Sequence, residues 1–285
     1  MPTTSQVREH SLGDEAGAVD PIEVRRTVLK MLYEGGASHL GSSMSAVEML
    51  IAMYSVVDCE LIKQVEPGRD RILISKGHCA AATYAVMAHN GIIPMQLLDT
   101  FHKDGSDLLG HVSHAVNGVE HSTGALGHGL SVGVGCALGL RVRGFTDRQV
   151  LVLCGDGEIQ EGSIWEALML AVHLRLGNLT VLIDNNGISS VTTTSDVIDM
   201  RPLKERFEGF GLATTELDGH SLSALISGIR TVQQDERPGV LICNTTKGRD
   251  VPFAENEPIW HYRTLTDDLY AEAGRHLDSL QQGRS

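Results

Sequence analysis

Two short runs of apolar residues, with a helical pattern between them, stand out in the middle of the chain. Val150 to Cys154 predicts a strand that is buried on both faces. Ser163 and Glu166 have the spacing of a helix capping box, and residues 167–176 are mostly apolar at helical spacing. Leu179 to Ile183 predicts a second buried strand. The stretch is therefore predicted to be a βαβ unit whose two strands run in the same direction.

The same reading extends to both sides of this unit. Pro21 can open a helix, and a second capping box is expected at Ser45 and Glu48. Helices are predicted from about residue 22 to 35, from 45 to about 57 and from about 81 to 89, and further strands over 71–75 and 239–244. We expect an α/β fold: a mostly parallel central sheet with helices on both faces, as one domain over residues 19–285. Residues 1–18 are polar without periodicity, and predict a disordered N-terminal arm.

Composition narrows the class of protein. The net charge of −13 argues against a nucleic-acid surface, so any phosphate must be bound locally. The five cysteines show no C-x-x-C spacing and are expected to be reduced core residues. The N-terminus lacks a basic-then-apolar signal, and no apolar run reaches the length of a membrane span. A cytoplasmic protein is therefore expected.

Polar residues follow each of the two central strands. Asp156 follows the first strand and Asn186 the second, so both are expected at the carboxyl edge of the sheet, where open α/β sheets bind ligands. A carboxylate, an amide oxygen and a nearby main-chain carbonyl suit Mg²⁺, which usually keeps positions for phosphate oxygens and water. The adjacent glycines allow close approach of a diphosphate, and a helix N-terminus favours its negative charge.

These residues carry a resemblance to a known family. Gly155-Asp156-Gly157, then Glu161-Gly162, then Asp184-Asn185-Asn186 resemble the thiamine-diphosphate motif in the version found in transketolases. The resemblance implies thiamine diphosphate held through Mg²⁺, or another divalent cation such as Ca²⁺ or Mn²⁺, with Asp156, Asn186 and the carbonyl of Ile188 as metal ligands. The cofactor-binding residues that it implies are Gly124, Ala125, Leu126, Gly155, Asp156, Gly157, Glu158, Glu161, Asn186, His78 and His261.

Four histidines stand in loops that are similar to active-site loops of transketolases. They are His39, His78, His111 and His261. The resemblance implies that they hydrogen-bond substrate oxygens and move protons, which suits imidazole near neutral pH. The match has departures, since Val112, His128 and Asp250 replace the family's proline, glutamine and second glycine. The turn at residues 218–221 also resembles a family Asp-Gly-His turn, although a capped turn is sufficient explanation for it.

Two other functions are weaker on the same residues. Residues 129–133 match the G-x-S-x-G elbow of hydrolases, but no buried strand comes immediately before Ser131. His111, His114 and His121 cluster in sequence, yet they lack the cysteines or the H-E-x-x-H helix of zinc sites. Neither the dinucleotide nor the P-loop glycine motif is present.

The resemblance covers about residues 22–276 and matches only the diphosphate-binding part of a transketolase. It implies a C-terminal transketolase subunit that carries the pyrimidine-binding domain and its catalytic glutamate, in an α2β2 assembly. The expected reaction moves a two-carbon ketol unit from a ketose donor, expected to be a phosphate, to an aldehyde or aldose acceptor. A 2-oxo acid decarboxylating synthase, a component that loads an acyl or glycolyl carrier, and a non-catalytic paralogue are the alternatives.

Overall fold

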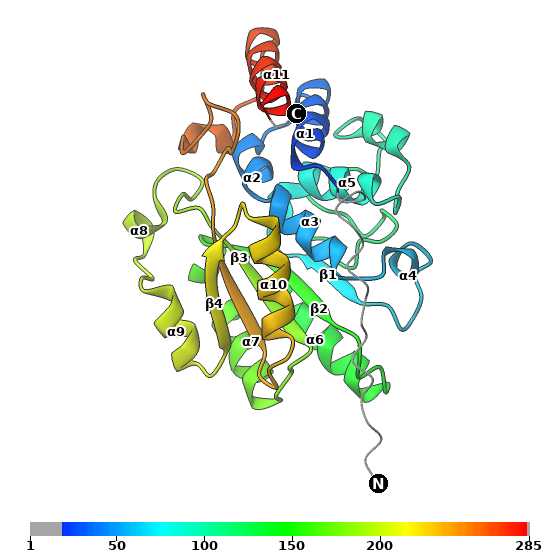
Figure 1. Ribbon diagram of the computed structural model, residues 1–285, viewed down its shortest axis with the longest axis vertical. Helices are drawn as coiled ribbons and strands as arrows, with labels where there is room; N and C mark the ends of the chain where they lie inside the picture. The colour runs from blue at the N-terminus through cyan, green and yellow to red at the C-terminus, as the bar shows by residue number, and fades with distance from the viewer. Residues whose placement is uncertain (1–18, 284–285) are drawn as a thin grey trace.

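Five parallel strands form one sheet at the centre of the computed structural model, which describes residues 19–283 (Figure 1). Their order is β1-β2-β3-β5-β4. The strands are β1 (Arg71–Ile74), β2 (Val150–Gly155), β3 (Leu179–Asn185), β4 (Ala213–Asp218) and β5 (Gly239–Asn244). The predicted α/β class is thus confirmed, and the sequence did not predict β4. The predicted arm at residues 1–18 lies outside the described residues.

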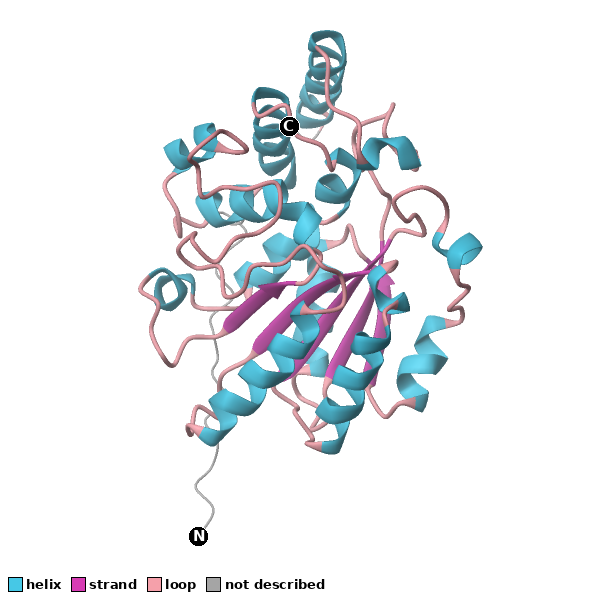
Figure 2. Cartoon of the chain, turned by 180° about the vertical axis from the view of Figure 1, so that it is seen from behind, coloured by secondary structure: helices cyan, strands magenta, loops and turns pink. Residues whose placement is uncertain are grey.

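Helices cover both faces of this sheet. Figure 1 shows α10 and α3 in front of the strands, and Figure 2 shows the opposite face covered by the helices α6 and α7. The helices are α1 (Pro21–Glu34), α2 (Leu40–Ser45), α3 (Val47–Ser55), α4 (Cys59–Lys63), α5 (Ala80–His89), α6 (Gly129–Val142), α7 (Gly162–His173), α8 (Thr194–Val197), α9 (Leu203–Gly209), α10 (Leu222–Val232) and α11 (Asp267–Gln282). Short 3₁₀ helices are η2 (Gly77–Cys79), η3 (Met95–Thr100), η4 (Glu158–Gln160) and η5 (Pro258–His261).

Alternate residues of the central strands enter two different hydrophobic cores. Leu151 and Leu153 of β2 belong to the core under α3 and α10, whereas Val150 and Val152 belong to the core under α6 and α7. Successive side chains of a strand point to opposite faces, so a strand between two helical layers must be apolar at every position. This requirement explains the uninterrupted apolar run that predicted β2.

A helical layer lies beyond the carboxyl ends of the strands. It contains α1, α2, α5 and α11, and α1 packs against both α5 and α11 (Figure 1). Tyr33 of α1 and Tyr270 of α11 stack with ring centroids 4.2 Å apart. In the same layer α2 contacts η2 and η5, which brings three loops of the chain over the ends of β2 and β3.

Both predicted capping boxes are wrong. Helix α7 begins at Gly162, and the Ser163 hydroxyl donates to the carbonyl of Gly127, 2.9 Å away, instead of capping the helix. Ser45 ends α2, and its hydroxyl donates to Asp184 at 2.6 Å, while Glu48 pairs with Arg25 in the core. Distant partners therefore took side chains that the local pattern assigned to helix ends.

Candidate active site

The carboxyl ends of β2 and β3 open into a cavity of about 540 Å³. Predicted site residues from several separate segments line it together. They are His39, His78, His111, Gly124, Leu126, Gly155, Asp156, Gly157, Glu158, Asn186, Ile188 and His261. Ala125 and Glu161 are not among the lining residues, and Glu161 is exposed at the N-cap of α7. Their predicted contact with a cofactor stays a prediction.

Asp156 and Asn186 form a group of oxygen atoms at the floor of this cavity. The Asp156 carboxylate accepts hydrogen bonds from the backbone N–H groups of Gly157, at 2.8 Å, and Gly187, at 2.5 Å. The Asn186 side-chain oxygen accepts from the backbone N–H of Ile188 at 3.1 Å. These bonds tie the end of β2 to the loop after β3 and hold the oxygen atoms of the two side chains on neighbouring segments.

The charge of this group fits a divalent cation. Burial, and then the negative charge of Asp184, raise the pKa of Asp156 to about 6. A cation would remove this cost, and carboxylate, amide and carbonyl oxygens are the ligands that Mg²⁺ takes. Among residues 19–283 no three His, Cys, Asp or Glu side chains converge on a possible metal position, which leaves the zinc alternative without a site.

Two buried lysines that the sequence did not predict stand beside these oxygens. Lys76 pairs with Asp184 and donates to the Ser42 carbonyl at 3.0 Å. Lys247 donates to the carbonyls of Ile188, at 3.0 Å, and Ser189, at 2.7 Å. The Ile188 oxygen that was predicted as a metal ligand therefore already accepts from an ammonium group, and a carbonyl keeps a second lone pair for a metal.

Both lysines line the cavity, so the site can hold negative charge although the protein is acidic overall. Burial, followed by the positive charge of Lys76, lowers the pKa of Lys247 to about 8. Closely spaced positive charges repel each other, and a bound anion such as a diphosphate would relieve that repulsion. The signal in the sequence was the position of Lys76 two residues before His78, and of Lys247 in the Thr-x-Lys-Gly segment.

The four predicted histidines meet at the mouth of the cavity. The ring centroids of His39 lie 5.1 Å from those of His111 and His261, and His78 lies 5.2 Å from His261. His39 is in the left-handed region with φ 71°, and its backbone N–H donates to the His261 carbonyl at 3.1 Å. The structure thus brings together residues from four loops, as the resemblance implied.

These histidines are neutral at physiological pH. Burial, and then the charge of His111, lower the pKa of His39 to about 4, and burial followed by Lys247 lowers that of His261 to about 3. Burial is also the first cause of the lowered pKa values of His78 and His111. Nδ1 of His261 has no hydrogen-bond partner among the described residues, so this atom is available to a ligand.

Glu158 holds the wall of the site. Its carboxylate accepts hydrogen bonds from the backbone N–H groups of Gly127, at 2.8 Å, and Gly155, at 3.1 Å, and from the Ser75 hydroxyl. The loop that contains Gly124 and Leu126 is thereby fixed to the ends of β1 and β2. Glu158 lines the cavity, but its hydrogen bonds show that it positions the loop.

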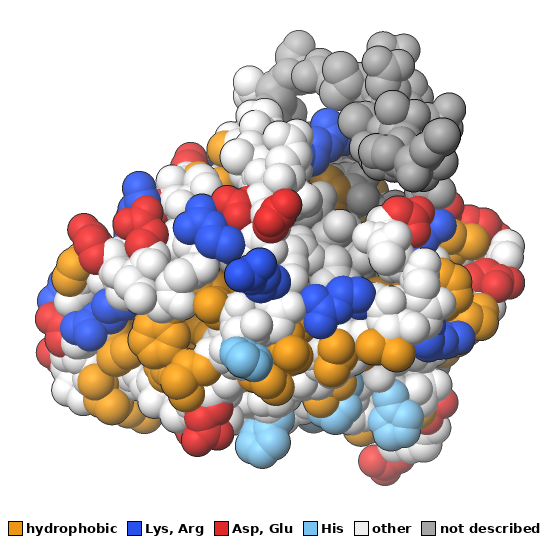
Figure 3. Space-filling model, turned by 90° about the horizontal axis from the view of Figure 1, so that it is seen from below, with side chains coloured by type: hydrophobic (Ala, Val, Ile, Leu, Met, Phe, Trp, Pro, Cys, Tyr) orange, Lys and Arg blue, Asp and Glu red, His pale blue; other side chains and the backbone are white. Residues whose placement is uncertain are grey.

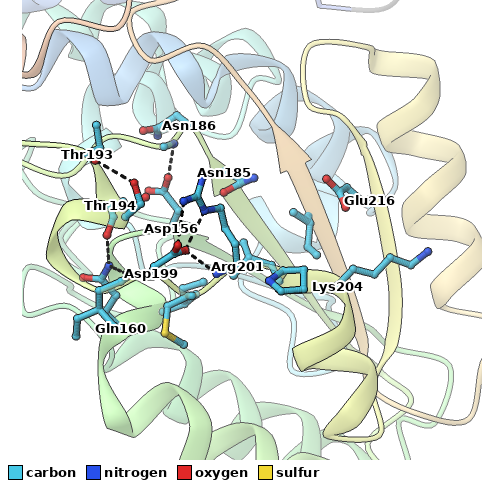
Figure 4. A pocket seen from close by; sticks show the side chains of 18 of the residues that line it. Asp156, Gln160, Asn185, Asn186, Thr193, Thr194, Asp199, Arg201, Lys204 and Glu216 are labelled. Atoms are coloured by element: carbon cyan, nitrogen blue, oxygen red, sulfur yellow. Dashed lines mark hydrogen bonds and ion pairs between the residues drawn. The ribbon is translucent and has the colours of Figure 1, made fainter.

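A second cavity of about 630 Å³ lies on the other side of the loop that follows β3 (Figure 4). It shares Asp156 and Asn186 with the first, and Figure 4 shows these two side chains close together in its wall. Gln160 secures the loop by donating to the carbonyls of Thr194 and Ile198. This cavity is larger but lacks the histidines and the buried lysines, so the chemistry belongs to the smaller one.

The hydrolase alternative fails in the structure. Ser131 lies within the first turn of α6, which follows a loop and not a strand. The strand-to-helix turn that exposes a nucleophilic serine is therefore not formed here.

Comparisons with known proteins agree with this site. Residues 21–278 match the family model of the transketolase thiamine diphosphate binding domain. One of the two subunits of an apulose-4-phosphate transketolase from Phocaeicola vulgatus is 36% identical over 255 residues, which are 89% of this chain and 90% of that protein. A 6-deoxy-6-sulfo-D-fructose transketolase subunit from Clostridium sp. is 31% identical over 90% of this chain and 94% of that protein.

Solved structures give the same fold. A transketolase from Campylobacter jejuni superposes with a TM-score of 0.82 at 24% identity, over 90% of this chain and 42% of that chain. The fold and the cavity define a thiamine diphosphate-binding domain. The chain belongs to the transketolase family, a family of transferases, and is similar over nearly its whole length to subunits of transketolases.

Proposed function

We propose that the chain binds thiamine diphosphate and Mg²⁺ in the 540 Å³ cavity and serves as the N-terminal subunit of a split transketolase. The observation that carries the proposal is the meeting of three elements there. Oxygen atoms of Asp156 and Asn186 suit a divalent cation, two buried lysines suit a diphosphate, and four neutral histidines surround the opening. When bound, thiamine diphosphate supplies the carbon nucleophile that accepts and releases a two-carbon ketol fragment.

The chain's own residues have distinct parts in this function. Asp156, Asn186 and the Ile188 carbonyl would hold the metal, and Lys247 would balance phosphate charge. Because His39, His78 and His261 are neutral, each imidazole can donate one hydrogen bond and accept another from a sugar hydroxyl. His111 extends this set toward the acceptor. Neutral imidazole can also take a proton from a hydroxyl and return it.

A partner subunit would complete the site. Relatives of similar length are named as transketolase subunits, which supports a separate C-terminal subunit that contributes the pyrimidine-binding domain and the catalytic glutamate. Self-association into α2β2 is supported by exposed apolar residues on α6 and α7, namely Val142, Met169 and Leu170. Figure 3 shows a band of hydrophobic side chains across the face of the molecule seen from below.

The substrates are proposed to be a ketose donor, as a phosphate or a similarly anionic sugar, and an aldose acceptor. The names of the relatives, one for apulose-4-phosphate and one for a sulfonated fructose, support a ketose with an acidic group. We further infer a cytoplasmic location. All five cysteines are free thiols, as expected in a reducing compartment, and no helix among the described residues could span a bilayer.

Reconstitution tests the proposal. The purified chain is mixed with Mg²⁺, thiamine diphosphate and the C-terminal subunit, and transfer from ketose phosphates to aldehydes is compared with consumption of 2-oxo acids. We expect ketol transfer only when both subunits are present. Full turnover from this chain alone would refute the partner requirement. Release of CO₂ from 2-oxo acids, without ketol transfer, would support the decarboxylating alternative instead.

A further inference from the structure

The turn between β4 and α10 contains a histidine that neither the metal site nor the histidine cluster uses. The residue is His220, whose side chain is 12% exposed. The sequence explained residues 218–221 as a capped turn, and Ser221 does cap α10 by accepting from the N–H of Ala224. His220 has no part in that cap. Its imidazole points into the protein, where each ring nitrogen has a partner.

One ring nitrogen faces a buried carboxylate. Nδ1 of His220 lies 3.2 Å from a Glu48 oxygen on α3. Arg25 of α1 donates two hydrogen bonds to the same carboxylate, at 2.8 and 2.9 Å. Burial acts to raise the pKa of Glu48, but the bonds from His220 and Arg25 outweigh burial and lower it to about 2. Glu48 is therefore an anion, and an anion requires a donor at Nδ1.

The other ring nitrogen accepts from the backbone. The N–H of Thr246 donates to Nε2 of His220 at 2.9 Å. A nitrogen that accepts carries a lone pair, so the imidazole is neutral with its proton on Nδ1. The carboxylate of Glu48 thus selects the tautomer, and the tautomer allows the ring to hold the main chain at Thr246.

Thr246 lies in the middle of the loop that enters the cofactor cavity. Its neighbour Thr245 donates to Asp184, and Lys247 donates to the carbonyls of Ile188 and Ser189. The N–H of Gly248 donates to the Gly41 carbonyl at 3.0 Å. Every residue from 245 to 248 is therefore anchored, and Thr246 is the one that His220 anchors.

The turn approaches this loop closely. The N–H of Gly219 donates to the Asn244 carbonyl at 2.8 Å, and a Cβ at Gly219 would collide with Thr245. Only glycine allows the turn to come near enough for the next residue to reach Thr246. The geometry points to His220 as a positioning residue for the cofactor: through the main chain of Thr246 it fixes Lys247 beside the predicted metal and diphosphate. This inference rests on the proposed function.

Two substitutions separate the two contacts of the ring. In His220→Gln the amide oxygen can reach the position of Nε2 and still accept from Thr246. In His220→Asn the shorter amide can donate to Glu48 but does not reach Thr246. Loss of one hydrogen bond predicts that His220→Asn weakens binding of Mg²⁺–thiamine diphosphate by about tenfold, whereas His220→Gln stays within about threefold of the wild type. His276→Asn on α11 is the matched control and should leave binding unchanged.

The measurements are isothermal titration of the two-subunit complex with Mg²⁺–thiamine diphosphate, thermal unfolding of each variant, and ¹⁵N NMR of the histidine rings in the chain alone. We expect Nδ1 of His220 to be protonated and Nε2 unprotonated at pH 7. The inference is overturned if the ring has the other tautomer, or if His220→Asn lowers only the melting temperature. It is also overturned if both variants lose affinity equally. If the wild type binds no cofactor, the proposed function itself fails, whatever the tautomer.

Discussion

The buried pair of Lys76 and Asp184 offers a quantitative test of the structure. The two side chains are 2% and 0% exposed, and Ser45 and Thr245 also donate to the carboxylate. Lys76→Met would remove the ammonium and leave Asp184 charged in the core. Removing one partner of a buried pair typically costs 3–5 kcal/mol, so we expect the free energy of unfolding to fall by about 4 kcal/mol. Such a loss is a large part of the roughly 5–15 kcal/mol that stabilises a typical domain.

Urea unfolding of the cofactor-free chain, followed by circular dichroism, measures this loss. A second variant that combines Lys76→Met with Asp184→Asn should regain at least about 1 kcal/mol over Lys76→Met alone, because it buries no charge. Lys30→Met is the matched control. Lys30 pairs with Asp99 at 2.9 Å, but the side chains are 49% and 59% exposed, so solvent screens the pair and the effect should be much smaller.

Acid should change the outcome in a defined direction. Without Lys76, burial raises the pKa of Asp184 above its unfolded value, so the folded variant gains stability as pH falls and the carboxyl binds a proton. The deficit of Lys76→Met is therefore expected to be smaller at pH 5 than at pH 7.5. A loss below about 1 kcal/mol at pH 7.5, or a double variant less stable than Lys76→Met, would refute the assigned role of the pair.

Three further predictions follow from the site and its surroundings. Asp156→Ala should weaken Mg²⁺-dependent binding of thiamine diphosphate by about 100-fold or more in calorimetry of the two-subunit complex, and unchanged affinity would exclude Asp156 as a ligand. His39 and His261 have pKa values lowered to about 4 and 3, so NMR should find both rings neutral down to pH 5, and a midpoint near 6.5 would contradict their burial. Glu48 has a pKa lowered to about 2, and its stabilising effect is present above pH 4.5 and declines as pH falls toward 2. Stability of Glu48→Gln should therefore depend less on pH between 5 and 3 than that of the wild type.

The fold was largely predictable because the central strands are continuous apolar runs. β2 and β3 lie between two helical layers, which requires apolar side chains on both faces. β4 was missed because it is an edge strand in which most residues are only half-buried or exposed, so its pattern of Ala-Thr-Thr-Glu-Leu-Asp lacks such a run. Burial, and not strand formation itself, is the property that the pattern detects.

The site was predictable where its residues lie in one local motif. Asp156 and Asn186 follow neighbouring strands, so the parallel topology alone placed them together. Lys76 and Lys247 were missed because their burial depends on contacts with Ser42, Asp184 and Ile188, which are far away in sequence. Both capping boxes failed for the same reason, since Ser163 and Glu48 have tertiary partners that no local spacing reveals.

The carboxylate of Glu158 has a consequence for substitutions at that position. Its two oxygens only accept hydrogen bonds, from Gly127, Gly155 and Ser75. An isosteric glutamine would turn an NH₂ group toward a backbone N–H, so that two donors would face each other in a buried place. The mildest exchange by size would consequently detach the glycine-rich loop from the sheet, and a difference of one atom would separate an assembled cofactor wall from an open one.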